Sequence, residues 1–196
     1  MTSRQKQAQK TKNKIYNSAI NLMQKKGIEQ TTIADICKKA NVSVGSFYNY
    51  FNSKDEVLYA VYQSADQYFE DVVEQEVADL PVYEKIITFI RHYAKYNTEQ
   101  GLDFITRLYF NSENKHFLER DRYMHVLMKK ILAEAQDNLL LTSALSADEI
   151  NEFFFLVARG VVSDWCLRDG DYDLEERMVF YFELMLKDGG NLLVKA

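Results

Sequence analysis

The sequence predicts an all-α fold, and three observations support this prediction. The 196 residues include only one proline, Pro81, and seven glycines. The alternation of apolar and polar residues that is typical of half-buried strands is not sustained anywhere. Apolar residues instead recur three and four positions apart, as they do on one face of a helix. The length is sufficient for one large or two small domains.

The first predicted helix ends at Gly27. Ile15, Ala19, Leu22 and Met23 would share one of its faces, and glycine is the residue that most often closes a helix. The residues before this helix are polar and rich in lysine. We therefore expect residues 1–9 to form a flexible basic tail.

Residues 31–58 predict a helix-turn-helix, which is the most informative feature of the chain. Thr32 and Asp35 have the spacing of a capping box, in which each side chain bonds the other residue's backbone amide at a helix start. Ile36 and Ala40 then follow on one apolar face. Asn41 suits the turn because asparagine tolerates a left-handed backbone.

The second helix of this motif is predicted to begin after Ser43, a good N-cap residue. Its first residues, Val44, Gly45 and Ser46, are small. Small side chains allow the start of a helix to enter the major groove of DNA, where larger ones would hold the backbone away. We expect these three residues to approach base edges, with Asn49 as a weaker candidate.

The aromatic run from Phe47 to Phe51 is predicted to divide between two faces. Phe47 and Phe51 are four residues apart and should face the core, whereas Tyr48 and Tyr50 should carry their hydroxyl groups outward. A purely structural motif would leave these outward side chains unexplained. The residues expected to contact DNA phosphates are Thr32, Ser43, Tyr48, Tyr50 and Lys54.

A further helix is predicted to start at Ser53, because Ser53 and Glu56 repeat the spacing of a capping box. Lys54 lies in its first turn. The N-terminus of a helix attracts anions, so this position suits a phosphate group.

Basic residues are concentrated at the N-terminal end. Residues 1–56 contain ten Lys and Arg against four Asp and Glu, whereas the rest of the chain contains 14 against 25. A basic block on an acidic body is the charge distribution expected of a DNA-binding module attached to another domain. This distribution favours a DNA-binding motif over a purely structural one.

The remaining residues predict further helices. A long one should run from Ser53 to about Asp79, where Pro81 would begin the next, which ends near Thr98. The others are a short helix around residues 104–110, one that contains Leu118 to Ala135, and two at about residues 147–168 and 173–188, with a polar gap over residues 111–115.

The last two helices carry apolar side chains on more than one face, although a surface helix needs only one apolar stripe. We interpret the additional face as a dimer interface, and the alternative is that both helices form the centre of a monomeric core. The residues expected at this interface are Phe153, Val157, Gly160, Val161, Phe180 and Leu184.

Taken together, residues 10–60 resemble the tetracycline-repressor (TetR) family of transcription factors. The matching residues are Thr31–Thr32, Ile36, Ala40–Ser43, Gly45, Phe47–Tyr48, Tyr50–Phe51 and Ser53–Glu56. One departure is Asn41, where the family commonly has glycine. The resemblance implies a DNA-binding domain over residues 1–52 and a helical ligand-binding and dimerisation domain over residues 53–196.

The resemblance also implies a homodimer that reads an inverted-repeat operator in double-stranded DNA and is released by a small-molecule inducer. An apolar or aromatic effector would suit the many aromatic residues of the body, although any helical bundle of this size needs aromatic residues in its core. The residues expected to line the effector pocket are Phe89, Tyr93, Phe104, Tyr109, Tyr123 and Trp165.

Other classes of protein fit less well. No catalytic motif is present, and His92, His116 and His125 do not have metal-ligand spacing, so we expect neither an enzyme nor a metal site or cofactor. The longest apolar run has six residues, and the N-terminus is polar, so we expect a cytoplasmic protein without a membrane span or secretory signal. Cys37 and Cys166 are expected to be buried thiols.

The main alternative function is a helical adaptor or chromosome-organising protein that binds DNA without sequence preference. Such a protein would not need the small residues at the start of the second helix. Its affinity for DNA would fall with salt but would not change with base sequence.

Overall fold

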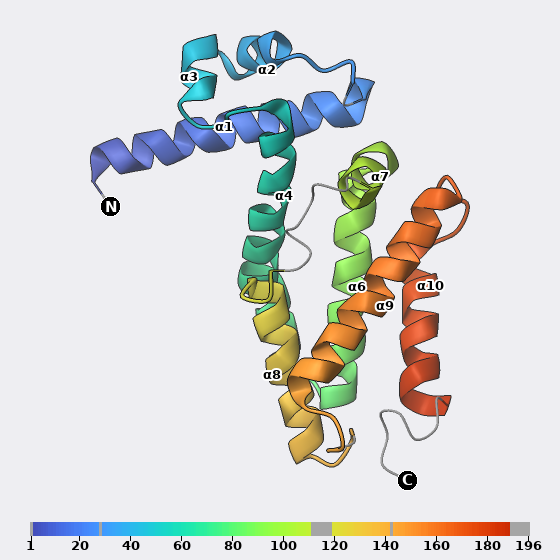
Figure 1. Cartoon of the computed structure of the whole chain (residues 1–196). Helices are drawn as coiled ribbons and strands as arrows, with labels where there is room; N and C mark the ends of the chain where they lie inside the picture. The colour runs from blue at the N-terminus through green and yellow to red at the C-terminus, as the bar shows by residue number, and fades with distance from the viewer. Residues whose placement is uncertain (1, 28, 111–118, 142, 189–196) are drawn as a thin grey trace. The chain divides into compact units, whose positions relative to one another are not determined.

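The computed structural model describes residues 2–27, 29–110, 119–141 and 143–188. Within these ranges the chain is helical and contains no strand, as Figure 1 shows. The α-helices are α1 (Ser3–Lys26), α2 (Ile33–Ala40), α3 (Val44–Tyr48), α4 (Lys54–Tyr68), α5 (Glu74–Val77), α6 (Val82–Gln100), α7 (Leu102–Phe110), α8 (Tyr123–Asp137), α9 (Ala147–Leu167) and α10 (Leu174–Glu183).

Two π-helical segments complete the secondary structure. The segment η1 (Phe69–Val73) continues α4 into α5, and η3 (Leu184–Asp188) extends α10. When these continuous helices are joined, the described residues form nine helices, which confirms the predicted all-α fold class. The predicted polar gap over residues 111–115, together with His116 and Leu118, lies outside the described residues.

The chain forms two compact units. The N-terminal unit comprises Met1–Gln63 and Asp103–Asn114, and the C-terminal unit comprises Ser64–Leu102 and Lys115–Ala196. The sequence instead suggests a boundary between residues 52 and 53. The units divide within α4 because no proline or glycine interrupts the chain between residues 53 and 80, so one continuous helix serves both.

In the N-terminal unit, α2 packs on α1 and α3 packs on α2. Ile15, Ala19, Ile36, Ala40 and Phe47 are completely buried. These residues are the apolar positions that the sequence places on the inward faces of the first three helices. The helical spacing of apolar residues therefore identifies this core correctly.

The N-terminal tail differs from the prediction. We expect a flexible tail over residues 1–9, but α1 begins at Ser3. Thr2 caps the helix, because the Gln5 amide donates to Thr2 Oγ1 at 3.2 Å and the Thr2 amide donates to Gln5 Oε1 at 2.7 Å. No proline or glycine occurs before Gly27, so the capped helix continues through residues whose side chains are mostly exposed.

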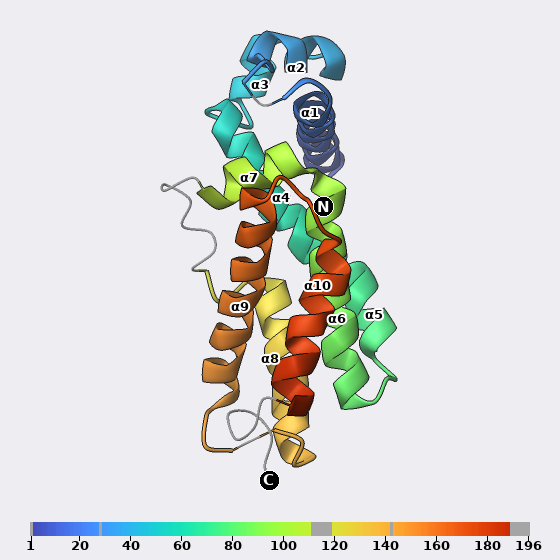
Figure 2. The same cartoon turned by 90° about the vertical axis from the view of Figure 1, so that its right-hand side faces the viewer.

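In the C-terminal unit, α6 packs against α8 and α10, and α8 packs against α9. Figure 2 shows the same helices after a quarter turn. Pro81 directly precedes α6, as the sequence predicts, since proline at this position removes no helical hydrogen bond. The core includes the fully buried rings of Phe69, Phe89, Phe154 and Phe182. None of the described helices is both long and apolar enough to span a membrane.

A buried ion pair joins α4 to the start of α8. Arg122 has a side chain that is 7% exposed, and its Nε donates to Asp66 Oδ2 at 3.1 Å. The backbone amide of Met124 also donates to Asp66 Oδ1, at 3.3 Å. Asp66 therefore fixes the first turn of α8 against α4.

Replacement of Asp66 by asparagine is expected to reduce the free energy of unfolding of the C-terminal unit by about 3 kcal/mol, because it removes the negative charge that pairs with the buried Arg122 side chain. Urea denaturation followed by Trp165 fluorescence would measure this loss. The matched control is Glu175→Gln, which removes the exposed ion pair with Arg91 and should cost less than about 1 kcal/mol. Equal losses of unfolding free energy in the two variants would contradict a stabilising role for the ion pair between Asp66 and Arg122.

Candidate DNA-binding interface

The turn between α2 and α3 has the local structure that the sequence predicts. Thr32 caps α2, and its Oγ1 accepts from the Asp35 amide at 3.1 Å. Asn41 closes α2 in the left-handed conformation, with φ of 50°. Hydrogen bonds from Lys26 and Thr32 lower the pKa of Asp35 far below its usual value. The Asp35 carboxylate is therefore ionised and links α1 to the start of α2.

The first residues of α3 form a small, open surface. Ser43 caps the helix, because its Oγ accepts from the Ser46 amide at 3.0 Å. Val44 is 48% exposed, and a Cβ added at Gly45 would meet only the Ser43 hydroxyl, at 3.9 Å. Among the described residues of the N-terminal unit, none covers this tip, so it is accessible to a groove.

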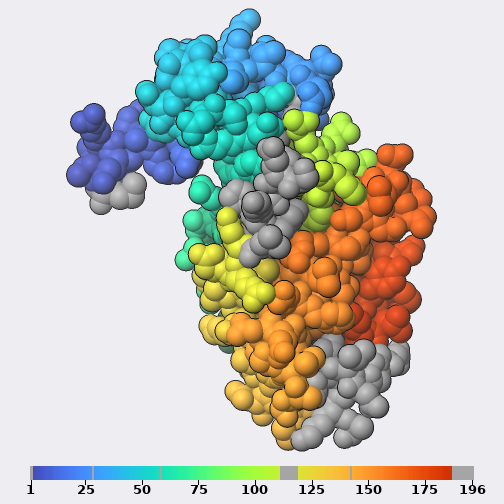
Figure 3. Space-filling model, in the orientation of Figure 1, coloured from blue at the N-terminus to red at the C-terminus, as the bar shows by residue number. Residues whose placement is uncertain are grey.

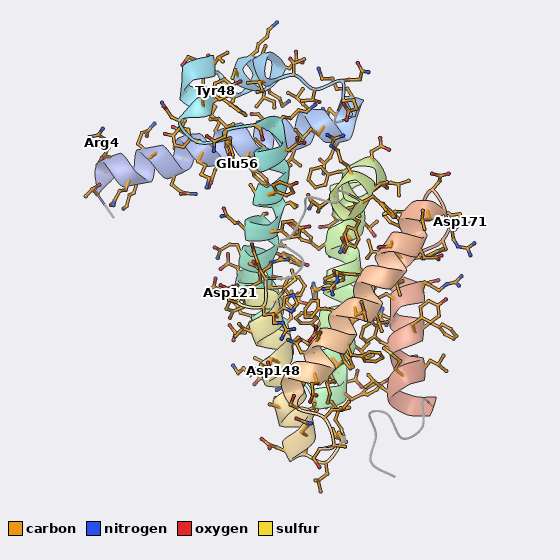
Figure 4. All side chains as sticks on the ribbon, viewed as in Figure 1. Arg4, Tyr48, Glu56, Asp121, Asp148 and Asp171 are labelled. Atoms are coloured by element: carbon orange, nitrogen blue, oxygen red, sulfur yellow. The ribbon has the colours of Figure 1, made fainter. Side chains whose placement is uncertain are left out.

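The aromatic run divides between two faces. Phe47 and Phe51 are buried, with ring centroids 5.8 Å apart. Tyr48 is 52% exposed on α3, where Figure 4 labels it, and Tyr50 is half-buried. Asn49, which ends α3, is exposed. The two faces are thus those that the helical spacing indicates.

At two of the predicted phosphate contacts, Thr32 and Lys54, a carboxylate of the protein lies where the phosphate would bind. The Thr32 hydroxyl donates to Asp35 Oδ2 at 2.6 Å, so a carboxylate already occupies it. The capping box at α4 is also shifted by one residue from the expected pairing: Ser53 Oγ accepts from the Glu56 amide, but the Glu56 carboxylate accepts from the backbone of Asn52. Because this carboxylate lies at the helix start, a phosphate contact at Lys54 would depend on the lysine side chain itself.

The structure adds Arg107, which the sequence does not single out. Arg107 lies on α7 within the N-terminal unit and pairs with Glu29 and with Asp55, at the start of α4. It therefore ties α7 to two segments beside the helix-turn-helix. No sequence pattern indicates this contact, because the partners lie 78 and 52 residues away along the chain.

The residues expected to line an effector pocket are divided between the two compact units. Phe104 and Tyr109 belong to the N-terminal unit, whereas the other four belong to the C-terminal unit. Of these four, Phe89 and Tyr93 pack against Phe155, with ring centroids 6.1 and 5.8 Å away.

The remaining two aromatic residues have structural partners. Tyr123 donates its hydroxyl to Glu74 at 2.5 Å, which raises the pKa of Tyr123 to about 12. Trp165 donates from Nε1 to the carbonyl oxygen of Tyr172 at 3.1 Å, and it lines a shallow pocket of about 360 Å³. That these six aromatic residues line an effector pocket stays a prediction.

The outer faces of α9 and α10 carry exposed apolar side chains. Leu156 is 61% exposed, Phe180 is 57% exposed, and Phe153, Leu167 and Leu184 are also exposed. Figure 3 shows these helices, in orange and red, together on one side of the C-terminal unit.

The other expected interface residues differ in their exposure. Gly160 is exposed, and a Cβ added there would meet nothing within 4 Å. Val157 is half-buried, and Val161 is buried within its own subunit, so Val161 does not contribute to the outer face.

Residues 15–61 match the family model described as bacterial regulatory proteins of the tetR family. Across most of its length the chain is similar to a fatty acid metabolism regulator protein of Bacillus subtilis, with 20% identity over 82% of this chain and 86% of the relative. It is also similar to a probable acrEF/envCD operon repressor of Escherichia coli, with 25% identity over 86% of this chain and 81% of the relative.

Among solved structures, the fold is similar to that of the transcriptional regulator FadR from Bacillus subtilis in complex with stearoyl-CoA. The TM-score is 0.68 at 22% identity, and the match covers 89% of this chain and 97% of the other. At this identity the similarity establishes the fold, in which a helix-turn-helix is joined to a helical body.

Proposed function

We propose that the chain is a ligand-responsive repressor of the TetR family that binds operator DNA as a homodimer. The main observation in support is the open tip of α3, where Val44 and Gly45 are exposed beside the buried Phe47. This arrangement leaves room for the helix start to approach base edges.

Each further part of the proposal has its own support. The basic N-terminal residues favour DNA over an acidic partner. The exposed apolar face of α9 and α10 supports a second copy of the chain as the partner in a dimer. A similar regulator has been solved with stearoyl-CoA bound, which supports a small-molecule effector for this chain as well.

We place the protein in the cytoplasm, where operator DNA is available, and we propose no catalytic activity, since the relatives are regulators rather than enzymes.

Selection of binding sites from a random DNA pool would test sequence-specific binding. We expect an inverted repeat whose half-sites are separated by about 34–36 Å, one turn of DNA, because two α3 helices of a dimer would contact the same face of the duplex. Binding without any enriched sequence would support the alternative of a non-specific DNA-binding protein.

The proposed contacts predict two classes of variant. Tyr48→Phe and Lys54→Ala should weaken binding to every sequence alike, each by about 1 kcal/mol per subunit, and Lys54→Ala should also flatten the salt dependence. Val44→Ser should instead change which half-site is preferred, because Val44 is expected to approach base edges. Fluorescence anisotropy with operator and scrambled DNA at several salt concentrations would measure these effects.

The matched control for these variants is Lys129→Ala, which removes an exposed lysine from the C-terminal unit. It should leave DNA affinity unchanged. Unchanged affinity in both Tyr48→Phe and Lys54→Ala would contradict the phosphate contacts, whatever Val44→Ser does.

A further inference from the structure

The N-terminal half of α1, residues 3–14, forms a basic arm that extends beyond the helix-turn-helix. These residues are helical, but the first buried side chain of α1 is that of Ile15. Figures 1 and 3 show this part of α1, in dark blue, reaching past α3. The arm contains no acidic residue, and its cations are Arg4, Lys6, Lys10, Lys12 and Lys14.

None of the arm cations is neutralised by a carboxylate in the part of the chain that the structure describes. The first acidic residue along the chain is Glu29. The four carboxylates of residues 1–56 bond elsewhere: Glu29 and Asp55 to Arg107, Asp35 to Lys26, and Glu56 to Asn52. The positive charge of the arm is therefore available to an anionic partner outside the chain.

The arm departs from the charge pattern that stabilises a helix. Lys6, Lys10 and Lys14 are four residues apart, so like charges are neighbours on one face. The first turn contains Arg4 and no acidic residue, although the helix dipole favours anions at this end. Both features are unfavourable in the free protein and become favourable when anions lie beside the arm. Because the cations are spread along about 15 Å of helix, a row of anions suits them better than a single one.

The polar side chains of the arm narrow the class of partner. Ala8 is the only apolar residue among residues 3–14. The arm therefore has no apolar face that could insert into a membrane surface or pack against another helix. A partner must instead be held by charge and hydrogen bonds, as the phosphate backbone of a nucleic acid is.

The inner end of the arm lies beside residues that are expected to contact DNA. Lys12 Nζ is 5.8 Å from the centroid of the Phe51 ring, and Phe51 directly follows Tyr50, an expected phosphate contact. The outer end is marked by Arg4, which Figure 4 labels. The eight residues from Lys12 back to Arg4 span about 12 Å of helix. Since DNA rises by about 3.4 Å for each base pair, this length corresponds to about three or four base pairs.

We propose that the basic arm binds the phosphate backbone of duplex DNA next to the half-site that α3 contacts, without reading its base sequence. Arg4, Lys6 and Lys10 contact phosphates in the flanking DNA, and Lys12 stays beside Phe51. This inference rests on the proposed function, because α3 must place the protein on its half-site. It adds a contact that lengthens the bound DNA and increases the part of the affinity that salt removes.

Duplexes of two lengths test the contact with the full chain. One ends at the outer edges of the selected inverted repeat, and the other adds about six base pairs of arbitrary sequence on each side, which exceeds the reach of the arm. Fluorescence anisotropy at low salt should show that the longer duplex binds about tenfold more tightly, whatever its flanking sequence, because additional phosphate contacts release counterions. Equal affinity for the two duplexes overturns the proposal.

A variant with Arg4→Gln, Lys6→Gln and Lys10→Gln tests the arm itself. Glutamine has nearly the same helix propensity as lysine and arginine, and these exposed side chains are not part of the core, so the variant should fold normally. Circular dichroism verifies this. The variant should bind both duplexes equally, and its log–log salt slope should be shallower by about 0.9 for each lost phosphate contact. A variant that still binds the longer duplex more tightly overturns the proposal.

The matched control removes three exposed cations from the C-terminal unit, through Lys95→Gln, Lys129→Gln and Lys130→Gln. It changes the net charge by the same amount as the arm variant. We expect it to keep the tighter binding to the longer duplex, because the arm is intact. Equal loss in the control and the arm variant would show that net charge, rather than the arm, is responsible, and would overturn the proposal.

Site selection and the duplexes of two lengths together separate this inference from the proposed function. If an inverted repeat is selected but the flanks add no affinity, the regulator proposal stands and the arm proposal fails. If no sequence is enriched but the arm variant binds random duplexes more weakly than the control, the arm binds DNA and the sequence-specific function fails. Binding to single-stranded RNA or anionic lipid vesicles that only the arm variant loses, with no effect of DNA flanks, would assign the arm to that partner and overturn the proposal.

Discussion

Replacement of Leu156 and Phe180 by glutamate is expected to convert the protein to monomers and to weaken operator binding at least about a hundredfold. Both side chains are mostly exposed on the outer faces of α9 and α10. Glutamate there would place two like charges from each subunit in an apolar interface. A monomer can contact only one half-site. In a dimer, binding of the first half-site holds the second α3 close to the other half-site, and this high effective concentration raises the affinity for the whole operator.

Sedimentation analysis and fluorescence anisotropy on the same samples would measure both effects. Val72→Glu, at an exposed apolar residue on η1, introduces the same charge away from the proposed interface and serves as the control. A double variant that remains dimeric and retains operator affinity would show that α9 and α10 do not form the interface.

Replacement of Phe47 by alanine is expected to reduce the free energy of unfolding of the helix-turn-helix by about 3–5 kcal/mol and to abolish specific DNA binding. The Phe47 ring is completely buried and packs against Phe51. Since α3 has only five residues, this ring is its main attachment to the rest of the N-terminal unit. Hydrogen exchange over residues 33–51 would report the loss locally.

Tyr48→Ala is the matched control, because Tyr48 is the neighbouring aromatic residue but is exposed. This variant should weaken DNA binding and leave hydrogen exchange over residues 33–51 nearly unchanged. Similar loss of protection in the two variants would contradict the division of the aromatic run into a buried and an exposed face.

The features that the sequence predicts well are local. The capping box at Thr32 and Asp35, the left-handed Asn41 and the buried pair Phe47 and Phe51 each depend on residues at most four positions apart. Helix propensity, capping and turn conformation act over such distances, so they can be read from the order of residues. The start of α1 differs from the prediction because a basic, exposed segment can still be helical when it is capped, as Thr2 and Gln5 cap this one.

The features that the sequence does not predict join residues that are far apart along the chain. Asp66 and Arg122 are separated by 56 residues, and Arg107 lies 78 residues from Glu29. A surface pocket of about 350 Å³, lined in part by His125 on α8 and by Asn151 and Phe155 on α9, also depends on tertiary packing.

The outer faces of α9 and α10 have a genetic consequence if they pair two subunits. Each subunit would present the same surface, so a chain with a defective α3 would still associate with an intact one. Such a mixed dimer would have only one functional DNA-binding helix α3. Alleles damaged only at α3 would therefore be dominant over the wild-type gene, whereas alleles damaged at α9 would be recessive.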